Sequence, residues 1–151
     1  MPTATYTSRR SELETYFDRT AADAWKKLTS DAPVSKIRAT VRAGRNRMRD
    51  NLLSWLPADL SGLKLLDAGC GTGALSMEAA SRGAHVTAID LSETLVGYAA
   101  ELARQTPLKG RIDFRVGDML DPALGEFDHI VCMDSLIHYD SKDIVRVLSQ
   151  L

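Results

Sequence analysis

Leu65-Leu66-Asp67-Ala68-Gly69-Cys70-Gly71-Thr72-Gly73 is the stretch that decides the fold. Its pattern predicts a buried strand that runs into a glycine-rich turn and then into a helix. Glycine lets backbone amides approach a ligand that a Cβ would block, and the first turn of the helix adds free N–H groups and a positive dipole end. Asp67 stands two residues before the first glycine. An acid beside such a loop suits a ligand with a cationic end. The pyrophosphate of a dinucleotide is anionic and would be repelled by this acid.

Strands and helices alternate outward from this stretch. We expect strands at residues 63–68, 85–90, 112–116 and 127–133. The first intervening helix runs from the glycine loop to Arg82 with Gly83 as its cap, and Ser92 begins a second helix that stops before Pro107. This order predicts an α/β fold: a parallel sheet with right-handed crossovers and helices on both faces.

The segment before this α/β part is helical. We divide the chain into a helical segment at 1–57 and an α/β segment at 58–151. A first helical run ends at Asp31-Ala32-Pro33, and its apolar residues are Leu13, Tyr16, Phe17, Ala21, Ala24, Trp25 and Leu28. This run forms either a packing face or an apolar lid built from Tyr16, Phe17 and Trp25.

A second N-terminal helix carries two stripes. One is apolar, formed by Ile37, Val41, Met48, Leu52 and Trp55, and the other is basic, formed by Arg38, Arg42, Arg45 and Arg49. Such a basic stripe is usually a solvated face. The alternatives are that it binds carboxylates, an anionic membrane surface or a partner.

Composition sets broad limits on the class of protein. The chain has 151 residues, of which 44% are hydrophobic and 26% charged, and a net charge of -1 gives no argument for nucleic-acid binding. No stretch is apolar enough to span a membrane, and the first residues lack the core of a signal peptide. Two unpaired cysteines, Cys70 and Cys132, fit a reducing compartment, so we expect a cytoplasmic protein.

The predicted site lies where the strands end. Asp90 closes the second strand, where an acid can accept both ribose hydroxyls of a nucleoside, and Asp118 follows the third. The alternatives are structural: Asp67 and Asp90 merely cap the next helices, and Asp118 is a turn residue that bonds its own backbone. Residues 69–74 also satisfy the relaxed dinucleotide pattern, so a nicotinamide-dependent enzyme stays open.

The glycine stretch with its acids resembles the first motif of class I S-adenosylmethionine-dependent methyltransferases, which have a Rossmann-like fold. In that family the second-strand acid binds ribose, and the acid after the third strand meets the adenine amino group. The resemblance makes 58–151 the S-adenosylmethionine-binding half of such a domain. It implies this cofactor-binding set: Asp67, Gly69, Cys70, Gly71, Gly73, Asp90, Leu91, Asp118, Met119 and Met133.

The family normally has a seven-stranded sheet, whereas four strands are expected here. The chain also stops inside the periodic pattern of a last helix that begins at Asp140 or Ser141. We therefore expect a fragment that lacks its C-terminal strands. Met133-Asp134-Ser135-Leu136 departs from the proline-rich tetrapeptide of nucleic-acid amino-methyltransferases, which argues against a nucleic-acid substrate.

A closer resemblance rests on three segments besides the glycine stretch. These are Tyr16-Phe17-Asp18 with Thr20 and Trp25, the basic helix that ends near Trp55-Leu56, and Met133-Asp134-Ser135-Leu136-Ile137-His138-Tyr139. They are similar to the magnesium-protoporphyrin IX O-methyltransferases of chlorophyll and bacteriochlorophyll synthesis, in particular the purple-bacterial form.

This resemblance implies methyl transfer from S-adenosylmethionine to a propionate carboxylate of magnesium-protoporphyrin IX, giving the monomethyl ester. His138 would position or polarise the carboxylate, and Tyr16 would help to hold the substrate. Magnesium belongs to the substrate, so no protein metal site is expected. The family also implies a link to the large subunit of magnesium chelatase and contact with the photosynthetic membrane.

Other functions remain open on sequence alone. The same cofactor half is found in quinone and other small-molecule O-methyltransferases. The 151 residues are also compatible with a non-catalytic module that binds S-adenosylmethionine.

Overall fold

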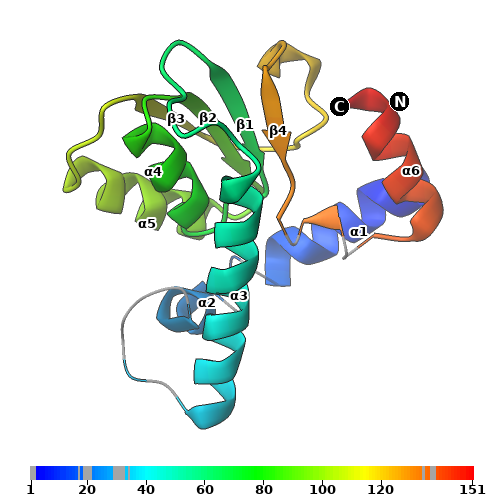
Figure 1. Cartoon of the computed structure of the whole chain (residues 1–151). Coiled ribbons are helices and arrows are strands. Elements are labelled where there is room, and N and C mark those ends of the chain that lie inside the picture. Colours follow the sequence, from blue (N-terminus) through cyan, green and yellow to red (C-terminus); the bar gives the residue numbers. More distant parts are fainter. Residues whose placement is uncertain are drawn as a thin grey trace.

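The computed structural model of the chain describes residues 3–16, 18, 22–28, 33, 35–133, 135–136 and 139–151. Its centre is a four-stranded sheet in the order β3-β2-β1-β4 (Figure 1). All three neighbouring pairs are parallel, as the strand–helix alternation predicts. The chain builds β1, β2 and β3 outward in one direction and then returns to place β4 on the other side of β1.

The strands match their expected positions closely, with one exception. β1 spans Lys64–Ala68, β2 His85–Asp90 and β3 Arg111–Val116. β4 is only His129–Val131, shorter than the expected 127–133. It pairs with β1 alone, in a register that ends at Asp67↔Val131. Because β1 turns away into the glycine loop just beyond, residues 132 and 133 have no strand to pair with.

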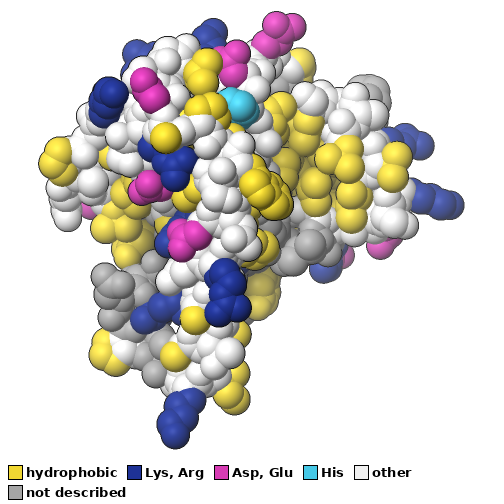
Figure 2. All heavy atoms as spheres, in the orientation of Figure 1, with side chains coloured by type: hydrophobic (Ala, Val, Ile, Leu, Met, Phe, Trp, Pro, Cys, Tyr) yellow, Lys and Arg dark blue, Asp and Glu magenta, His cyan; other side chains and the backbone are white. Residues whose placement is uncertain are grey.

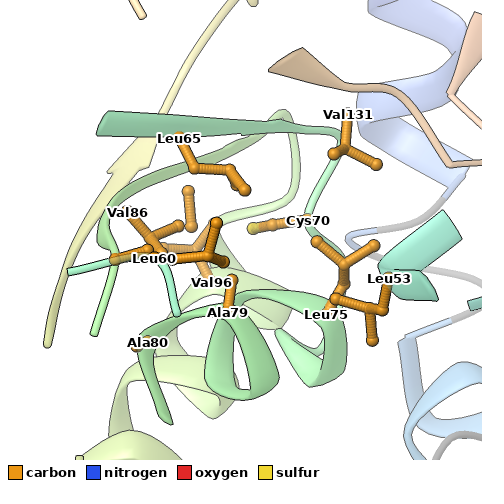
Figure 3. Close-up of a cluster of buried hydrophobic side chains, with 12 residues drawn as sticks. Leu53, Leu60, Leu65, Cys70, Leu75, Ala79, Ala80, Val86, Val96 and Val131 are labelled. Carbon is orange, nitrogen blue, oxygen red and sulfur yellow. The ribbon is translucent and has the colours of Figure 1, made fainter. Parts of the chain in front are cut away.

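Helices cover both faces of the sheet, as predicted. On one face Leu65, Val86 and Val131 pack with Leu75 and Val96 (Figure 3), which come from α4 (Ala74–Ser81) and α5 (Glu93–Arg104). The opposite face is covered by α1 (Ala4–Thr15) and α6 (Ser141–Gln150). Its core consists of Tyr6, Leu13, Leu66, Ala68, Ile89, Met119, Tyr139 and Val147. The two faces follow from the alternation of side chains along β1 and β2.

The caps of the two central helices confirm their predicted ends. At the end of α4, Gly83 has φ 98°, its N–H donates to the Ala80 carbonyl, and the Ala84 N–H donates to the Ala79 carbonyl. These are the two bonds of a glycine-terminated helix. Ser92 Oγ accepts from the Leu95 N–H and so begins α5.

The N-terminal run was predicted as one helix ending near Pro33, and this prediction is wrong. It forms two helices, α1 and α2 (Ala22–Leu28). Asp18, between them, accepts hydrogen bonds from Ser92 Oγ and the Thr94 N–H at the start of α5. Tyr16 and Asp18, the described residues between the two helices, are in π-helical conformation.

The third N-terminal helix, α3 (Lys36–Ser54), projects away from the sheet (Figure 1). Its base is anchored by Leu53, which is 3% exposed, and by the Arg82 side chain, which donates to the Leu53 carbonyl. The apolar stripe towards the projecting end is largely open, since Ile37 is 79% and Val41 46% exposed. Among the described residues no helix is both long and apolar enough to cross a lipid bilayer.

Candidate functional site

A pocket opens at the carboxyl edge of the sheet, around the point where β1 has β2 on one side and β4 on the other. Such a reversal of strand order leaves a crevice in which open α/β sheets bind their ligands. Nine of the ten predicted cofactor-binding residues line this pocket, and Gly73 does not. The other lining residues are Tyr6, Leu13, Arg45, Asn46, Arg49, Thr72, Ala74, Leu75, Ile89, Leu95, Gly117, Ser135 and Tyr139.

The glycine loop is held close against two neighbouring segments. The N–H groups of Gly69 and Cys70 both donate to the Ile89 carbonyl, at 2.8 and 3.0 Å. Gly69 has φ 85°, and a Cβ there would lie 2.5 Å from the Ser135 Cβ. Only glycine therefore lets this loop pass between β2 and the segment that follows β4.

Asp90 connects the end of β2 to the glycine loop. Its Oδ2 accepts from the Gly71 N–H at 2.9 Å, and its Oδ1 accepts from the Ser92 N–H at 3.0 Å. Burial raises the pKa of this carboxyl, and the two backbone donors partly offset that effect. The alternative that Asp90 has a structural role is therefore partly correct, because its carboxylate accepts hydrogen bonds from the local backbone. A carboxylate retains further acceptor positions on both oxygens, and Asp90 lines the pocket with them.

Asp67 is the most deeply buried acid of the pocket, with 2% exposure. Ser76 Oγ in α4 donates to its Oδ2 at 2.7 Å. Burial, together with the nearby Asp90 charge, raises the pKa of Asp67 to about 6, although the hydrogen bonds from Ser76 oppose the rise. Asp67 therefore bonds to the following helix, as the capping alternative predicts, and also brings a poorly solvated negative charge to the pocket.

Asp118 is bound by the N-terminal helix, which the sequence did not indicate. The Tyr6 hydroxyl donates to its Oδ1 at 2.7 Å, and Arg10 donates to its Oδ2 at 2.6 Å. The Leu120 N–H also donates to Oδ1, so the turn interpretation of Asp118 is correct in part. The Tyr6 ring stacks on Tyr139 with centroids 4.7 Å apart. No local pattern marks Tyr6 as a site residue, since its partners are more than a hundred residues away.

The arginines of the basic stripe on α3 differ in what they contact. Arg45 and Arg49 line the pocket, together with Asn46. Arg42 instead donates from Nη2 to the Lys27 carbonyl, which ties α3 to α2. The stripe is therefore not a uniformly solvated face.

The structure leaves the roles of the two predicted catalytic residues untested. His138 lies outside the residues that the structure describes. Tyr16 is 53% exposed and does not line the pocket as the described residues form it. Their roles stay predictions.

The fold, the glycine loop and the acids at three successive strand ends define a Rossmann-like domain of the methyltransferase class. The family model for the methyltransferase domain matches residues 65–151. The magnesium-protoporphyrin O-methyltransferase of Rhodobacter capsulatus is 53% identical over 97% of this chain, and that of Synechocystis is 35% identical over 90%. The chain spans 65% and 60% of the length of these two relatives.

A solved structure agrees with these relatives. The crystal structure of magnesium protoporphyrin IX methyltransferase from Synechocystis PCC 6803 with bound SAM superposes with a TM-score of 0.88 and 32% identity. The match covers 94% of this chain and 69% of the solved one. The chain belongs to the family of magnesium-protoporphyrin O-methyltransferases.

Proposed function

We propose that the protein to which this chain belongs methylates a propionate carboxylate of magnesium-protoporphyrin IX, with S-adenosylmethionine as methyl donor. The observation that supports this most strongly is the pocket at the sheet edge, where Asp67, Asp90 and Asp118 come together. The product would be the monomethyl ester used in chlorophyll or bacteriochlorophyll synthesis.

The residues of this pocket fit the donor group by group. We assign Asp90 to the ribose hydroxyls, because its carboxylate keeps free acceptor positions beside the glycine loop. Asp118 and the Met119 N–H are assigned to adenine. Asp67 faces the ammonium end of the methionine moiety, where a cation would favour its ionised form. S-adenosylmethionine itself supplies a methyl group on a positively charged sulfur, which is open to attack by an anion.

The acceptor requires little acid–base chemistry. A propionate is already ionised at neutral pH, so the protein has to align it and exclude water from it. We assign the positioning of this carboxylate to His138 and a weaker substrate contact to Tyr16. In this proposal residues 1–57 close over the substrate, and 58–151 hold the donor.

The test is methyl transfer from isotopically labelled S-adenosylmethionine. Magnesium-protoporphyrin IX and a catechol-type quinol are offered in parallel, both to this chain and to a form extended at its C-terminus. Label in a porphyrin ester and none in the quinol is the expected result for the extended form. Label in the quinol alone would replace the porphyrin with a quinone-type substrate. A preference for NAD over S-adenosylhomocysteine in a binding assay would remove the methyltransferase function altogether.

Peripheral contact with the photosynthetic membrane is a further proposal, supported by α3. Its exposed apolar residues Ile37 and Val41 lie near its projecting end together with Lys36, Arg38 and Arg42, and Figure 2 shows Lys and Arg side chains among hydrophobic ones there. Apolar residues flanked by cations suit an anionic lipid surface. Flotation with phosphatidylglycerol vesicles should recover the protein at low salt, and Ile37→Glu should reduce the recovery. Recovery that is equal with neutral phosphatidylcholine vesicles would contradict this contact.

Contact with the large subunit of magnesium chelatase is proposed on the family resemblance, because that subunit would deliver a poorly soluble substrate. Co-purification of the two proteins, with and without magnesium-protoporphyrin IX, tests it. Absence of a complex in both conditions would contradict the contact.

A further inference from the structure

The two sides of the pocket carry opposite charges. On the sheet side, Asp67 and Asp90 stand at the ends of neighbouring strands. On the α3 side, Arg45 and Arg49 line the same pocket. A ligand between these sides meets anions on one flank and cations on the other.

Arg45 and Arg49 act as a pair. They are four residues apart on one helix, so their side chains leave from the same face. Both are only partly exposed. Burial lowers the pKa of Arg45, and the charge of Arg49 lowers it further. Two like charges held close in a partly desolvated place repel each other, and an anion between them would relieve this repulsion.

A second positive feature borders the same part of the pocket. Thr72, Ala74 and Leu75 line it at the start of α4. The N-cap of that helix is Gly73, which provides no side-chain cap. The positive end of the helix dipole and the two guanidinium groups therefore favour an anion in the same region.

We propose that Arg45 and Arg49 form a carboxylate-binding subsite of this pocket. The proposal rests on the proposed function and specifies which residues recognise the carboxylates of its two reactants. One source is the α-carboxylate of the donor's methionine moiety, whose ammonium group would face Asp67. The other source is a porphyrin propionate. Guanidinium groups bind carboxylates through paired charge-assisted hydrogen bonds, which a glutamine side chain does not reproduce.

Arg47 provides a matched control. It lies on the same helix between the two arginines, is exposed and does not line the pocket. Arg47→Gln removes one positive charge from α3 without changing the pocket. Any general effect of the net charge of α3 would therefore appear in this variant as well.

The donor arm of the test compares S-adenosylmethionine with decarboxylated S-adenosylmethionine, which lacks only the carboxylate. Calorimetry is run on the unaltered chain, Arg45→Gln, Arg49→Gln and Arg47→Gln. If the subsite holds the donor, each pocket variant binds S-adenosylmethionine about 10-fold more weakly. Its affinity for the decarboxylated ligand then stays within twofold, and Arg47→Gln changes neither ligand.

The acceptor arm compares magnesium-protoporphyrin IX with its dimethyl ester, followed by quenching of tryptophan fluorescence. If the subsite holds a propionate, the pocket variants lose affinity for the free acid and keep it for the diester. A selective loss in either arm supports the subsite and identifies its carboxylate. The subsite is overturned if neither arm shows a selective loss, whether the affinities for both ligands of a pair stay unchanged or fall equally. Failure of the unaltered chain to bind any S-adenosyl ligand contradicts the proposed function instead, and the porphyrin arm still decides on the subsite.

Discussion

The two sides of the pocket are built in different ways. On the sheet side, backbone amides hold Asp90 at both oxygens, and Asp67 is fixed by Ser76. On the α3 side, Arg45 and Arg49 stand on a helix that projects from the sheet and is anchored at its base through Leu53. The rigid sheet side suits the nucleoside of the donor, which is the same in every turnover. The projecting helix suits a group that has to enter and leave the pocket. In our proposal, nucleoside recognition belongs to the sheet side and carboxylate recognition to α3.

The strongest challenge to this contrast is a pair of glycine substitutions, one on each side. Gly69→Ala places a Cβ 2.5 Å from the Ser135 Cβ at φ 85°, which we expect to destabilise the fold by roughly 2–4 kcal/mol. Gly44→Ala on α3 meets nothing within 4 Å and should stabilise the helix by about 0.5–1 kcal/mol. Urea unfolding of both variants provides the measurement. Equal effects would mean that the glycine loop is not the tightly fitted side.

The second test removes the charge of Asp90 and keeps its shape. Asp90→Asn should weaken binding of S-adenosylhomocysteine by about 1–3 kcal/mol, because the ribose hydroxyls lose a charged acceptor. Asp113→Asn is the control, since Asp113 is exposed on neighbouring β3 and bonds to His85. Calorimetry compares the two variants. An affinity for S-adenosylhomocysteine that does not change in Asp90→Asn would refute the assignment of ribose to Asp90.

Asp67 allows a test through pH. Because its pKa is raised to about 6 in the folded chain, against an ordinary value near 4, the folded state binds more protons than the unfolded state between these values. The contribution of Asp67 to stability therefore falls as pH rises from about 4 to 6. Asp67→Asn removes this cost, so its free energy of unfolding at pH 7 should exceed that of the unaltered chain by about 1–2 kcal/mol.

The same substitution should weaken donor binding, since the ammonium group loses its anion. Urea unfolding at a series of pH values gives the stability difference between the two proteins. A difference that is the same at pH 4 and pH 7 would show that Asp67 is not held in the strained, ionised state that the pocket is expected to use.

The smallest expected effect concerns the contact between α1 and the sheet side. Tyr6→Phe removes the hydroxyl that donates to Asp118 and keeps the ring that stacks on Tyr139. Since Arg10 and the Leu120 N–H still bind the carboxylate, the loss of stability should be about 1 kcal/mol. Tyr98→Phe on α5 is the control. A double-mutant cycle with Asp118→Asn that gives no coupling would mean that this bond does not hold α1 on the sheet.

The same contrast explains what could be predicted from the sequence. The sheet side follows from local patterns, because a strand, its terminal acid and the next glycine turn are neighbours in the chain. For this reason the strands predicted at 63–68 and 85–90 are found at Lys64–Ala68 and His85–Asp90, and Asp90 lies at the predicted edge of the sheet. The α3 side and Tyr6 depend on how distant helices pack, and no short stretch encodes that packing. The contact between Asp18 and α5 was missed for the same reason, because Thr94 lies far from Asp18 in the chain.

The most direct test of the account is a crystal structure of the chain with S-adenosylhomocysteine. We expect the ribose hydroxyls within hydrogen-bonding distance of Asp90, the adenine beside Asp118 and the amino-acid end between Asp67 and α3. A nucleoside that binds elsewhere, or that lies in the pocket with its sugar turned away from Asp90, would contradict the central claim that the acids at the strand ends recognise the donor.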